Sequence, residues 1–307
     1  MILAVLLHAA ASLQKPDAAA SPGPRRALAL ACDERRDCIV LFGGASDRGE
    51  TWKLNGKAWT RLELRGPDAR RGAAFVFDAK RGRCVLVGGS RGDDPTSPCF
   101  DETWTFDGKE WTKSAASIGV RSHFACAYDR KRERVVLVGG MDPGTGKGLD
   151  DVLEWDGASW STSAVRAPSA LFAPQMAYDE KSNVLVLTSS RPSDRKLMTW
   201  TFDGKAFSKV DEDGPAVILS GQSLATLGPG GGVLLFGGFD TSPLPDTWTW
   251  DGKTWKKLDA HGPPARLAHA LAYDRKRGRI VLYGGEDGKQ TFDDLWEFGK
   301  DTWNAVK

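Results

Sequence analysis

The chain has 307 residues, of which 41% are hydrophobic and 27% charged, a composition typical of a globular protein and not of a disordered or fibrous one. The net charge of +2 gives no global attraction to nucleic acid or to a membrane surface. No apolar run reaches the ~20 residues that cross a bilayer, so we predict no membrane span.

Residues 1–24 are expected to precede the folded domain. The segment begins MILAVLLHAAASLQ, with an apolar stretch from Ile2 to Leu7 and small residues at Ala9 to Ala11 that suit a cleavage site, although the basic residues of a secretory signal are missing. We interpret it as a signal or leader followed by a linker rich in Ala, Pro and Ser. This interpretation predicts a secreted or periplasmic protein, and a cytoplasmic one if the stretch is not a signal.

The remaining residues, 25–307, contain a repeated unit. A glycine doublet ends an apolar run five times, and Ser189-Ser190 fills the one gap, so that the first members lie 45, 51, 50, 48 and 47 residues apart. The doublets are Gly43 and Gly44, Gly88 and Gly89, Gly139 and Gly140, Gly237 and Gly238, and Gly284 and Gly285. Six units result, over approximately 25–66, 67–116, 117–166, 167–213, 214–261 and 262–307.

Each unit is predicted to form four strands, A to D. Strand A runs toward an Asp-led basic turn, and strand B is a β-branched run such as CIVLF (38–42) that is covered on both faces. Strand C, such as ETWKL (50–54), is followed by an Asn-Gly or Asp-Gly turn, which suits a two-residue hairpin. Strand D carries Phe207 in the fourth unit and a tryptophan in the others: Trp59, Trp111, Trp160, Trp255 and Trp303.

A single four-stranded sheet would leave these aromatic side chains in water. Six sheets packed around an axis bury them between neighbours. The sequence therefore predicts an all-β fold, a six-bladed β-propeller with four antiparallel strands per blade, formed by residues 25–307 as one domain.

The doublet after a β-branched run, followed by the aromatic residues of strands C and D at ~48-residue spacing, resembles the Kelch repeat. The resemblance implies a propeller of the galactose oxidase type. It also implies a non-catalytic binding module that recognises a protein or glycan through the face formed by the B–C and D–A connections.

Arginines recur on that face. Arg25, Arg70, Arg121 and Arg266 each lie eight residues before the Asp of the A–B turn, which places them at the opposite end of strand A; Leu171 and Ser220 are expected at this position in blades four and five. Arginine suits carboxylate, phosphate or sulfate, so these residues, with His123, Asp93 and Asp94, form the predicted ligand site, and the ligand can be anionic. The alternative is that the arginines pair with acidic loop residues or cap strand ends.

The opposite face carries basic A–B tips such as Arg35-Arg36 and Arg130-Lys131-Arg132. We expect a solvated rim there, with attraction of polyanions as the alternative. Because no aromatic residues interleave with the basic ones, no nucleic-acid partner is predicted.

Five cysteines leave at least one thiol unpaired. Cys32 and Cys38 flank the first A–B tip, and in an exported protein they could face each other and form a disulfide.

Catalysis is less well supported by the sequence. Galactose oxidase, which the repeat resembles, holds copper with two histidines, two tyrosines and a cysteine linked to a tyrosine, but here all four tyrosines are explained by the repeat. No metal motif occurs, and we predict no metal and no cofactor. The alternative function is a metal-free carbohydrate isomerase similar to the sialic acid mutarotases, which need only an arginine and a carboxylate in the central pocket.

Overall fold

The computed structural model describes residues 21–44, 49–92, 97–168, 171–191, 193, 195–211, 214–215 and 220–307. Most of the expected leader, residues 1–20, and the predicted site residues Asp93 and Asp94 therefore lie outside the described residues.

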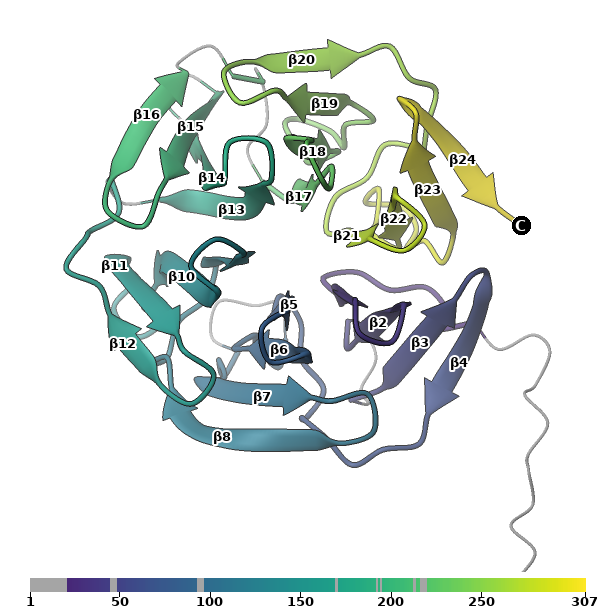
Figure 1. Ribbon diagram of the computed structural model, residues 1–307. Helices are drawn as coiled ribbons and strands as arrows, with labels where there is room; N and C mark the ends of the chain where they lie inside the picture. The colour runs from purple at the N-terminus through teal and green to yellow at the C-terminus, as the bar shows by residue number, and fades with distance from the viewer. Residues whose placement is uncertain are drawn as a thin grey trace, which may run out of the picture.

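Six four-stranded antiparallel sheets surround a central axis, as Figure 1 shows, and in each sheet the strands pair in chain order from A to D. This arrangement confirms the predicted all-β, six-bladed propeller. The strands of blades one and two are β1 (Ala29–Asp33), β2 (Cys38–Phe42), β3 (Thr51–Asn55), β4 (Ala58–Leu62), β5 (Ala74–Asp78), β6 (Arg83–Val87), β7 (Glu102–Phe106) and β8 (Trp111–Ser117). Those of blades three and four are β9 (Ala125–Asp129), β10 (Arg134–Met141), β11 (Gly148–Trp155), β12 (Trp160–Thr162), β13 (Phe172–Asp179), β14 (Val184–Arg191), β15 (Lys196–Phe202) and β16 (Phe207–Asp211). Those of blades five and six are β17 (Ser223–Thr226), β18 (Val233–Phe236), β19 (Thr247–Trp250), β20 (Trp255–Leu258), β21 (Ala270–Asp274), β22 (Arg279–Tyr283), β23 (Leu295–Gly299) and β24 (Thr302–Val306).

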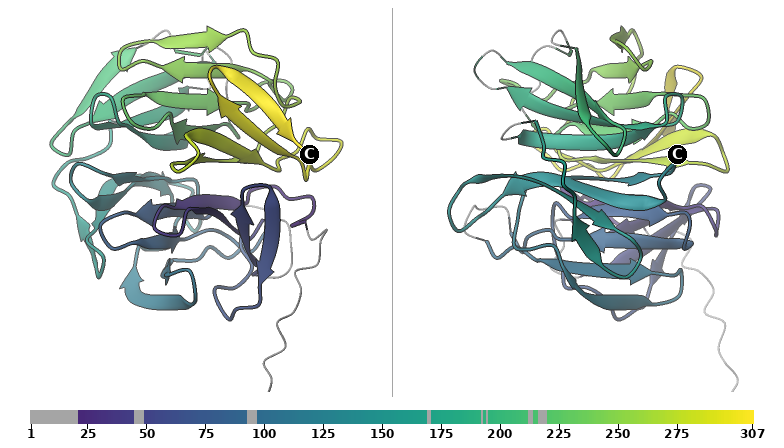
Figure 2. Two further views of the ribbon diagram at one scale, coloured as in Figure 1. Left: turned by 45° about the vertical axis from the view of Figure 1, so that its right-hand side comes forward. Right: turned by 60° about the vertical axis from the view of Figure 1, so that its left-hand side comes forward.

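In the described part of the chain, no helix is long and apolar enough to cross a membrane. Side views show the blades as twisted sheets stacked face to face, with the first and last blades in contact (Figure 2).

Strand B of each blade lies between its two neighbours, which explains its continuous apolar sequence. In β2, Ile39 and Leu41 pack toward blade six, whereas Val40 and Phe42 pack toward blade two. All four side chains are at most 1% exposed. Each inter-blade contact is therefore a separate hydrophobic layer, and the core is the sum of six such layers.

The glycine doublets let neighbouring blades approach each other closely. Gly43 has a positive φ of 68°, and a Cβ atom there would lie 2.5 Å from the main-chain oxygen of Arg70 in the next blade. That oxygen accepts a hydrogen bond from the N–H of Gly44 at 3.1 Å. A larger residue at Gly43 would push the second blade away, so the doublet is required by the blade junction.

The possible disulfide between Cys32 and Cys38 is not formed, and all five cysteines are free. Cys32 pairs with Ile39 across the β1–β2 ladder, and Cys38 pairs with Asp33, so the two cysteines are one position out of register. Because side chains alternate along a strand, Cys32 faces blade six and Cys38 faces blade two. Burial raises the pKa of Cys32 to about 12 and that of Cys38 to about 11, so both remain thiols.

Candidate functional site

Each of the four predicted arginines forms a buried ion pair with an acidic residue of its own blade. Each donates through Nη1 to the carbonyl of the first glycine of its doublet, at 2.9 to 3.1 Å, and each pairs with an acidic residue before or within strand C. The pairs are Arg25 with Glu50, Arg70 with Glu102, Arg121 with Asp151, and Arg266 with Asp294. Their side chains are at most 7% exposed.

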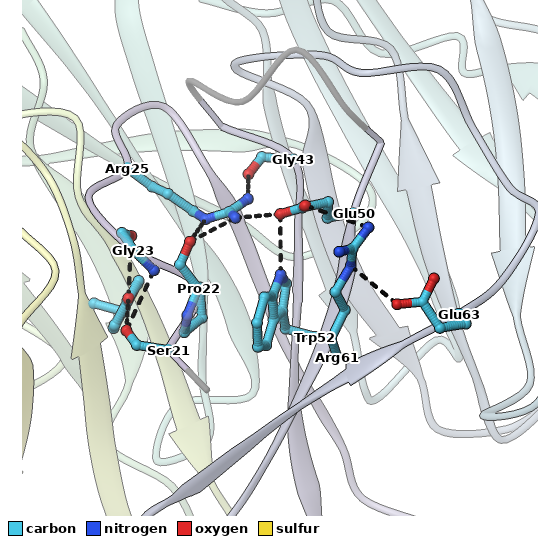
Figure 3. Close-up of polar contacts among 10 residues, drawn as sticks. Ser21, Pro22, Gly23, Arg25, Gly43, Glu50, Trp52, Arg61 and Glu63 are labelled. Atoms are coloured by element: carbon cyan, nitrogen blue, oxygen red, sulfur yellow. Dashed lines mark hydrogen bonds and ion pairs between the residues drawn. The ribbon is translucent and has the colours of Figure 1, made fainter. Parts of the chain in front are cut away.

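Arg25 illustrates the arrangement (Figure 3). Its Nε and Nη2 donate to the carbonyl of Pro22, Nη1 donates to that of Gly43, and Nη2 also pairs with Glu50. Glu50 accepts a further hydrogen bond from Trp52 Nε1 at 3.2 Å. The guanidinium is thus surrounded by acceptors from its own blade.

Phenylalanines of the B–C loops cover two of the arginines. Arg70 lies 3.8 Å from the ring centre of Phe100, and Arg266 lies 4.0 Å from that of Phe292. Burial alone would raise the pKa of Glu102, but hydrogen bonds from Lys113, Arg70 and Trp104 outweigh it and lower this pKa to about 2. These are the features of structural ion pairs, the alternative that the sequence left open.

A partial sequence signal for these pairs exists in the acidic residue that precedes the threonine position of strand C. It is present in the four blades that carry the arginine and also in blade five, where Asp246 pairs with Lys257, whereas blade four has Leu171 at the arginine position and Met198 before Thr199. In blade five, Ser220 forms a β-bridge with Phe239, as Leu267 does with Glu286. Ser220 therefore lies one position after the arginine position and not in it.

A cavity of about 610 Å³ lies at the end of the channel where the B–C and D–A connections meet. All six blades line it, and the four predicted arginines are not among its lining residues. Of the described residues that line it, Arg71 is the only Lys or Arg, and none is Asp or Glu. The described lining therefore offers mainly neutral hydrogen-bonding groups and apolar side chains.

A left-handed residue from each blade forms the rim of this cavity. These residues have φ values between 45° and 73°, and they are Ala27, Gly72, His123, Ala173, Gly221 and Ala268. Ala268 N–H donates to Gly221 O at 2.9 Å, Ala27 N–H to Ala268 O at 2.7 Å, and Gly72 N–H to Ala27 O at 2.9 Å. These bonds join blades five, six, one and two into a closed arc.

The rim from blade two through blades three and four to blade five is different. No corresponding hydrogen bond joins neighbouring rim residues there, within the residues that the structure describes. We call this part of the rim the open arc. On it, Ala173 O accepts a long hydrogen bond from Gln222 Nε2, at 3.5 Å, and a bound molecule can pair with the main-chain groups that no such bond engages.

His123, a predicted site residue, lies in the middle of the open arc. It is exposed, it lines the cavity, and its Nδ1 is 3.0 Å from Ser122 Oγ. Its φ of 52° is unfavourable for a residue other than glycine, at a cost of about 1–2 kcal/mol. Glycine occupies this position in blades two and five and alanine in blades one, four and six, so His123 is the rim residue with a side chain large enough to reach a ligand over the cavity.

Two lining residues in adjacent blades were missed by sequence reasoning. Gln222 and His269 are 2% and 4% exposed, and Gln222 Oε1 and both ring nitrogens of His269 have no hydrogen-bond partner. Burial, with the nearby Arg266, lowers the pKa of His269 to about 3, so the ring is neutral. A signal was available, because the corresponding positions in the other blades are apolar: Leu28, Ala73, Phe124 and Pro174.

The other end of the channel is crossed by ion pairs. Glu34 of blade one accepts from Arg130 of blade three at 2.6 Å and lies 3.4 Å from Arg275 of blade six, which also pairs with Glu180 of blade four. These four residues line the narrow end of the channel. The expected solvated rim is therefore wrong for these tips, since Arg130 and Arg275 are at most 29% exposed and ion-paired.

The channel mouth presents hydrogen-bonding side chains such as those of His123, Gln175 and Ser220. Within the described residues, no group of three or more His, Cys, Asp or Glu side chains could hold a metal ion. Scanning the sequence against protein-family models finds no matching family, and comparison with curated proteins finds no match.

Proposed function

We propose that the chain is an exported, Kelch-type binding propeller that recognises a protein or glycan ligand at the channel mouth. The spacing of the doublets and of the strand-C and strand-D aromatics supports the Kelch assignment. The apolar residues 2–7 and the small residues that follow support export.

The observation that carries the proposal is the open arc, with His123 held in a left-handed conformation at its centre. The closed arc already satisfies its own main-chain groups, and the far end of the channel is crossed by ion pairs. A ligand therefore approaches from the B–C and D–A face and rests against blades three to five. His123, Gln175 and Ser220 on these blades supply side-chain donors and acceptors.

The isomerase alternative requires a carboxylate beside an arginine in the cavity. Arg71 is present, but the described lining residues include no Asp or Glu. No observation in the structure favours this second function.

The test compares two substitutions that make the same backbone change. His123→Gly removes the imidazole and relieves the left-handed strain, whereas Ala268→Gly places glycine at the same rim position on the closed arc. Both variants are expected to fold with unchanged or higher stability. The parent and both variants are then screened on a glycan array and on an array of extracellular proteins.

We expect ligands found with the parent to lose about tenfold or more of their affinity for His123→Gly and to keep it for Ala268→Gly. Equal binding by the parent and His123→Gly would remove the open arc as the site. A triple substitution of the buried arginines would be a poor test, because it would destabilise three blades together.

A further inference from the structure

The channel has an apolar section between its two ends. The cavity at the mouth and a smaller one of about 190 Å³ at the narrow end share a lining residue from the same position of the inner strand in every blade. This residue pairs with a leucine of strand B, and we call the set the apolar ring: Leu30, Phe75, Cys126, Met176, Leu224 and Leu271. The inner strands that carry it surround the axis in Figure 1.

The approach to the apolar ring from the mouth is almost free of charge. The described residues that line the mouth cavity include one arginine and no Asp or Glu. On the far side of the ring, the ion pairs of Glu34 with Arg130 and of Glu180 with Arg275 cross the narrow end. A charged group that reached the ring would therefore lose its hydration, whereas an apolar group would gain by being buried there.

The apolar ring has its smallest side chain in blade three. Cys126 stands there, whereas the other five blades have leucine, phenylalanine or methionine. Cys126 and Leu224 are half-buried, so part of their surface is exposed in the channel. His123, at the centre of the open arc, precedes Cys126 by three residues, which span at most about 10 Å of extended chain. The ring therefore lies within reach of a ligand that rests on the open arc.

We infer that the ligand of the channel mouth is a protein loop that inserts an uncharged apolar side chain, such as that of leucine, against the apolar ring. The main chain of the loop pairs with the groups of the open arc that no described hydrogen bond engages. Roughly three extended residues on each side of the tip span the depth from the open arc to the ring. A sugar fits less well, because the described lining of the mouth cavity contains no Trp or Tyr on which it could stack. The inference rests on the proposed function and narrows its ligand to a protein.

Methionine methyl groups report on the channel directly. The chain has four methionines, of which Met176 belongs to the apolar ring, Met141 lines the mouth cavity and Met198 packs against the hydrophobic cluster between blades three and four. The full chain, labelled with ¹³C in these methyl groups, is titrated with N-acetyl-leucine amide and followed by NMR. N-acetyl-glycine amide lacks the side chain, N-acetyl-lysine amide carries a charge, and methyl β-glucopyranoside represents a glycan.

Two variants change the apolar ring. Leu224→Gln makes it polar at similar side-chain size, and Cys126→Leu fills it with the residue that blades one, five and six have. Leu258→Gln is the matched control, because Leu258 is a half-buried leucine on the outer strand of the same blade as Leu224. The Met198 signal shows whether each variant keeps its core.

We expect N-acetyl-leucine amide to shift the Met176 and Met141 signals saturably in the parent and in Leu258→Gln, and to leave Met198 in place. The other three probes should not shift Met176. The affinity of the leucine probe should fall about tenfold or more in Leu224→Gln and Cys126→Leu.

An unmoved Met176 signal in the parent would overturn the inference, as would an equal shift with the glycine or lysine derivative. A shift caused by the glucoside alone would also overturn it, because the ring would then accept a sugar. The proposed function is judged separately by the comparison of His123→Gly with Ala268→Gly. Ligands that depend on His123, together with an unmoved Met176 signal, would retain the proposed function and overturn this inference.

Discussion

The indole Nε1 of Trp111 in blade two donates a hydrogen bond to Thr51 Oγ1 in blade one, at 2.9 Å. At three further junctions, a strand-D tryptophan donates the equivalent bond to a threonine in strand C of the preceding blade. The pairs are Trp160 with Thr103, Trp255 with Thr199, and Trp303 with Thr247. Between blades three and four, Phe207 and Val152 belong to one hydrophobic cluster in place of such a pair. Between blades six and one, the donor Trp59 is present but Leu295 takes the acceptor position, so the hydrogen bond is a feature of four of the six junctions.

The direct hydrogen bond between Trp111 and Thr51 predicts a coupling in a double-mutant cycle. Thr51→Val should destabilise the protein by about 1–3 kcal/mol, because it leaves a buried indole N–H without an acceptor. Trp111→Phe in the Thr51→Val background should cost less than it does in the parent, since phenylalanine has no donor to satisfy. Urea unfolding of the four proteins measures the coupling, which we expect to be on the order of 1 kcal/mol.

The matched control for this cycle is Thr60→Val, on the exposed strand β4. It makes the same chemical change at a position where water can replace any lost contact. Additive effects of Thr51→Val and Trp111→Phe would show that the hydrogen bond contributes nothing to the blade junction.

Arg70→Ala is predicted to lower the free energy of unfolding. The side chain is 1% exposed, so the truncation removes a buried guanidinium from the carbonyl of Gly88 and from Glu102, which keeps Lys113, and should cost about 1–3 kcal/mol. Arg91→Ala is the control, because Arg91 is 60% exposed and its pair with Asp68 should contribute at most about 1 kcal/mol. Chemical unfolding measures both. An Arg70→Ala protein of parental stability that has lost ligand binding would restore the arginine to the ligand site.

The fold could be predicted because its signals are local and repeated six times. A doublet such as Gly43-Gly44 and a strand-D tryptophan such as Trp111 each mark a fixed place in the blade, and burying the aromatics requires stacked sheets. His123 could be placed at the channel mouth by the same logic, since strand direction alone assigns it to that face.

The partners of individual side chains could not be predicted in this way. Arg70 was correctly placed at one end of strand A, but Glu102 follows it by 32 residues, and only the three-dimensional blade brings the two together. Cys32 and Cys38 flank one hairpin tip, yet a one-residue register decides that they face different blades. Gln222 is distinguished from other polar residues only when the blades are superposed, because its counterparts in blades one to four are apolar and the one in blade six is His269.

Acid sensitivity is predicted from His269. Its pKa is about 3 in the folded protein, below the ordinary 6.5, so the unfolded chain takes up a proton that the folded protein does not. The contribution of neutral His269 to the free energy of unfolding is fully present above about pH 6.5. It is lost as the pH falls toward 3, at about 1.4 kcal/mol per pH unit. Glu102, with its pKa lowered to about 2, adds a further loss below its ordinary value of 4.5.

His269→Phe should flatten the pH dependence of stability between about 6.5 and 4.5, and phenylalanine already occupies the corresponding position of blade three as Phe124. His261→Phe, at an exposed histidine of a D–A connection, is the control. Urea midpoints at several pH values give the comparison. A parental slope in His269→Phe would mean that other groups cause the acid sensitivity.

Glu34→Gln tests whether ion pairs across the channel stabilise the propeller in addition to the contacts between adjacent blades. Glu34 joins Arg130 of blade three and Arg275 of blade six, and Arg275 continues the network to Glu180 of blade four. Removing this carboxylate charge leaves two partly buried guanidinium groups with one remaining acid between them. We therefore expect a loss of about 1–3 kcal/mol in urea unfolding, together with faster amide exchange in the inner strands β1, β9 and β21. Glu63→Gln, at a side chain that is 79% exposed, should change neither quantity. Unchanged amide exchange in the inner strands of Glu34→Gln would mean that the contacts between adjacent blades stabilise the propeller and that the ion pairs in the channel contribute nothing.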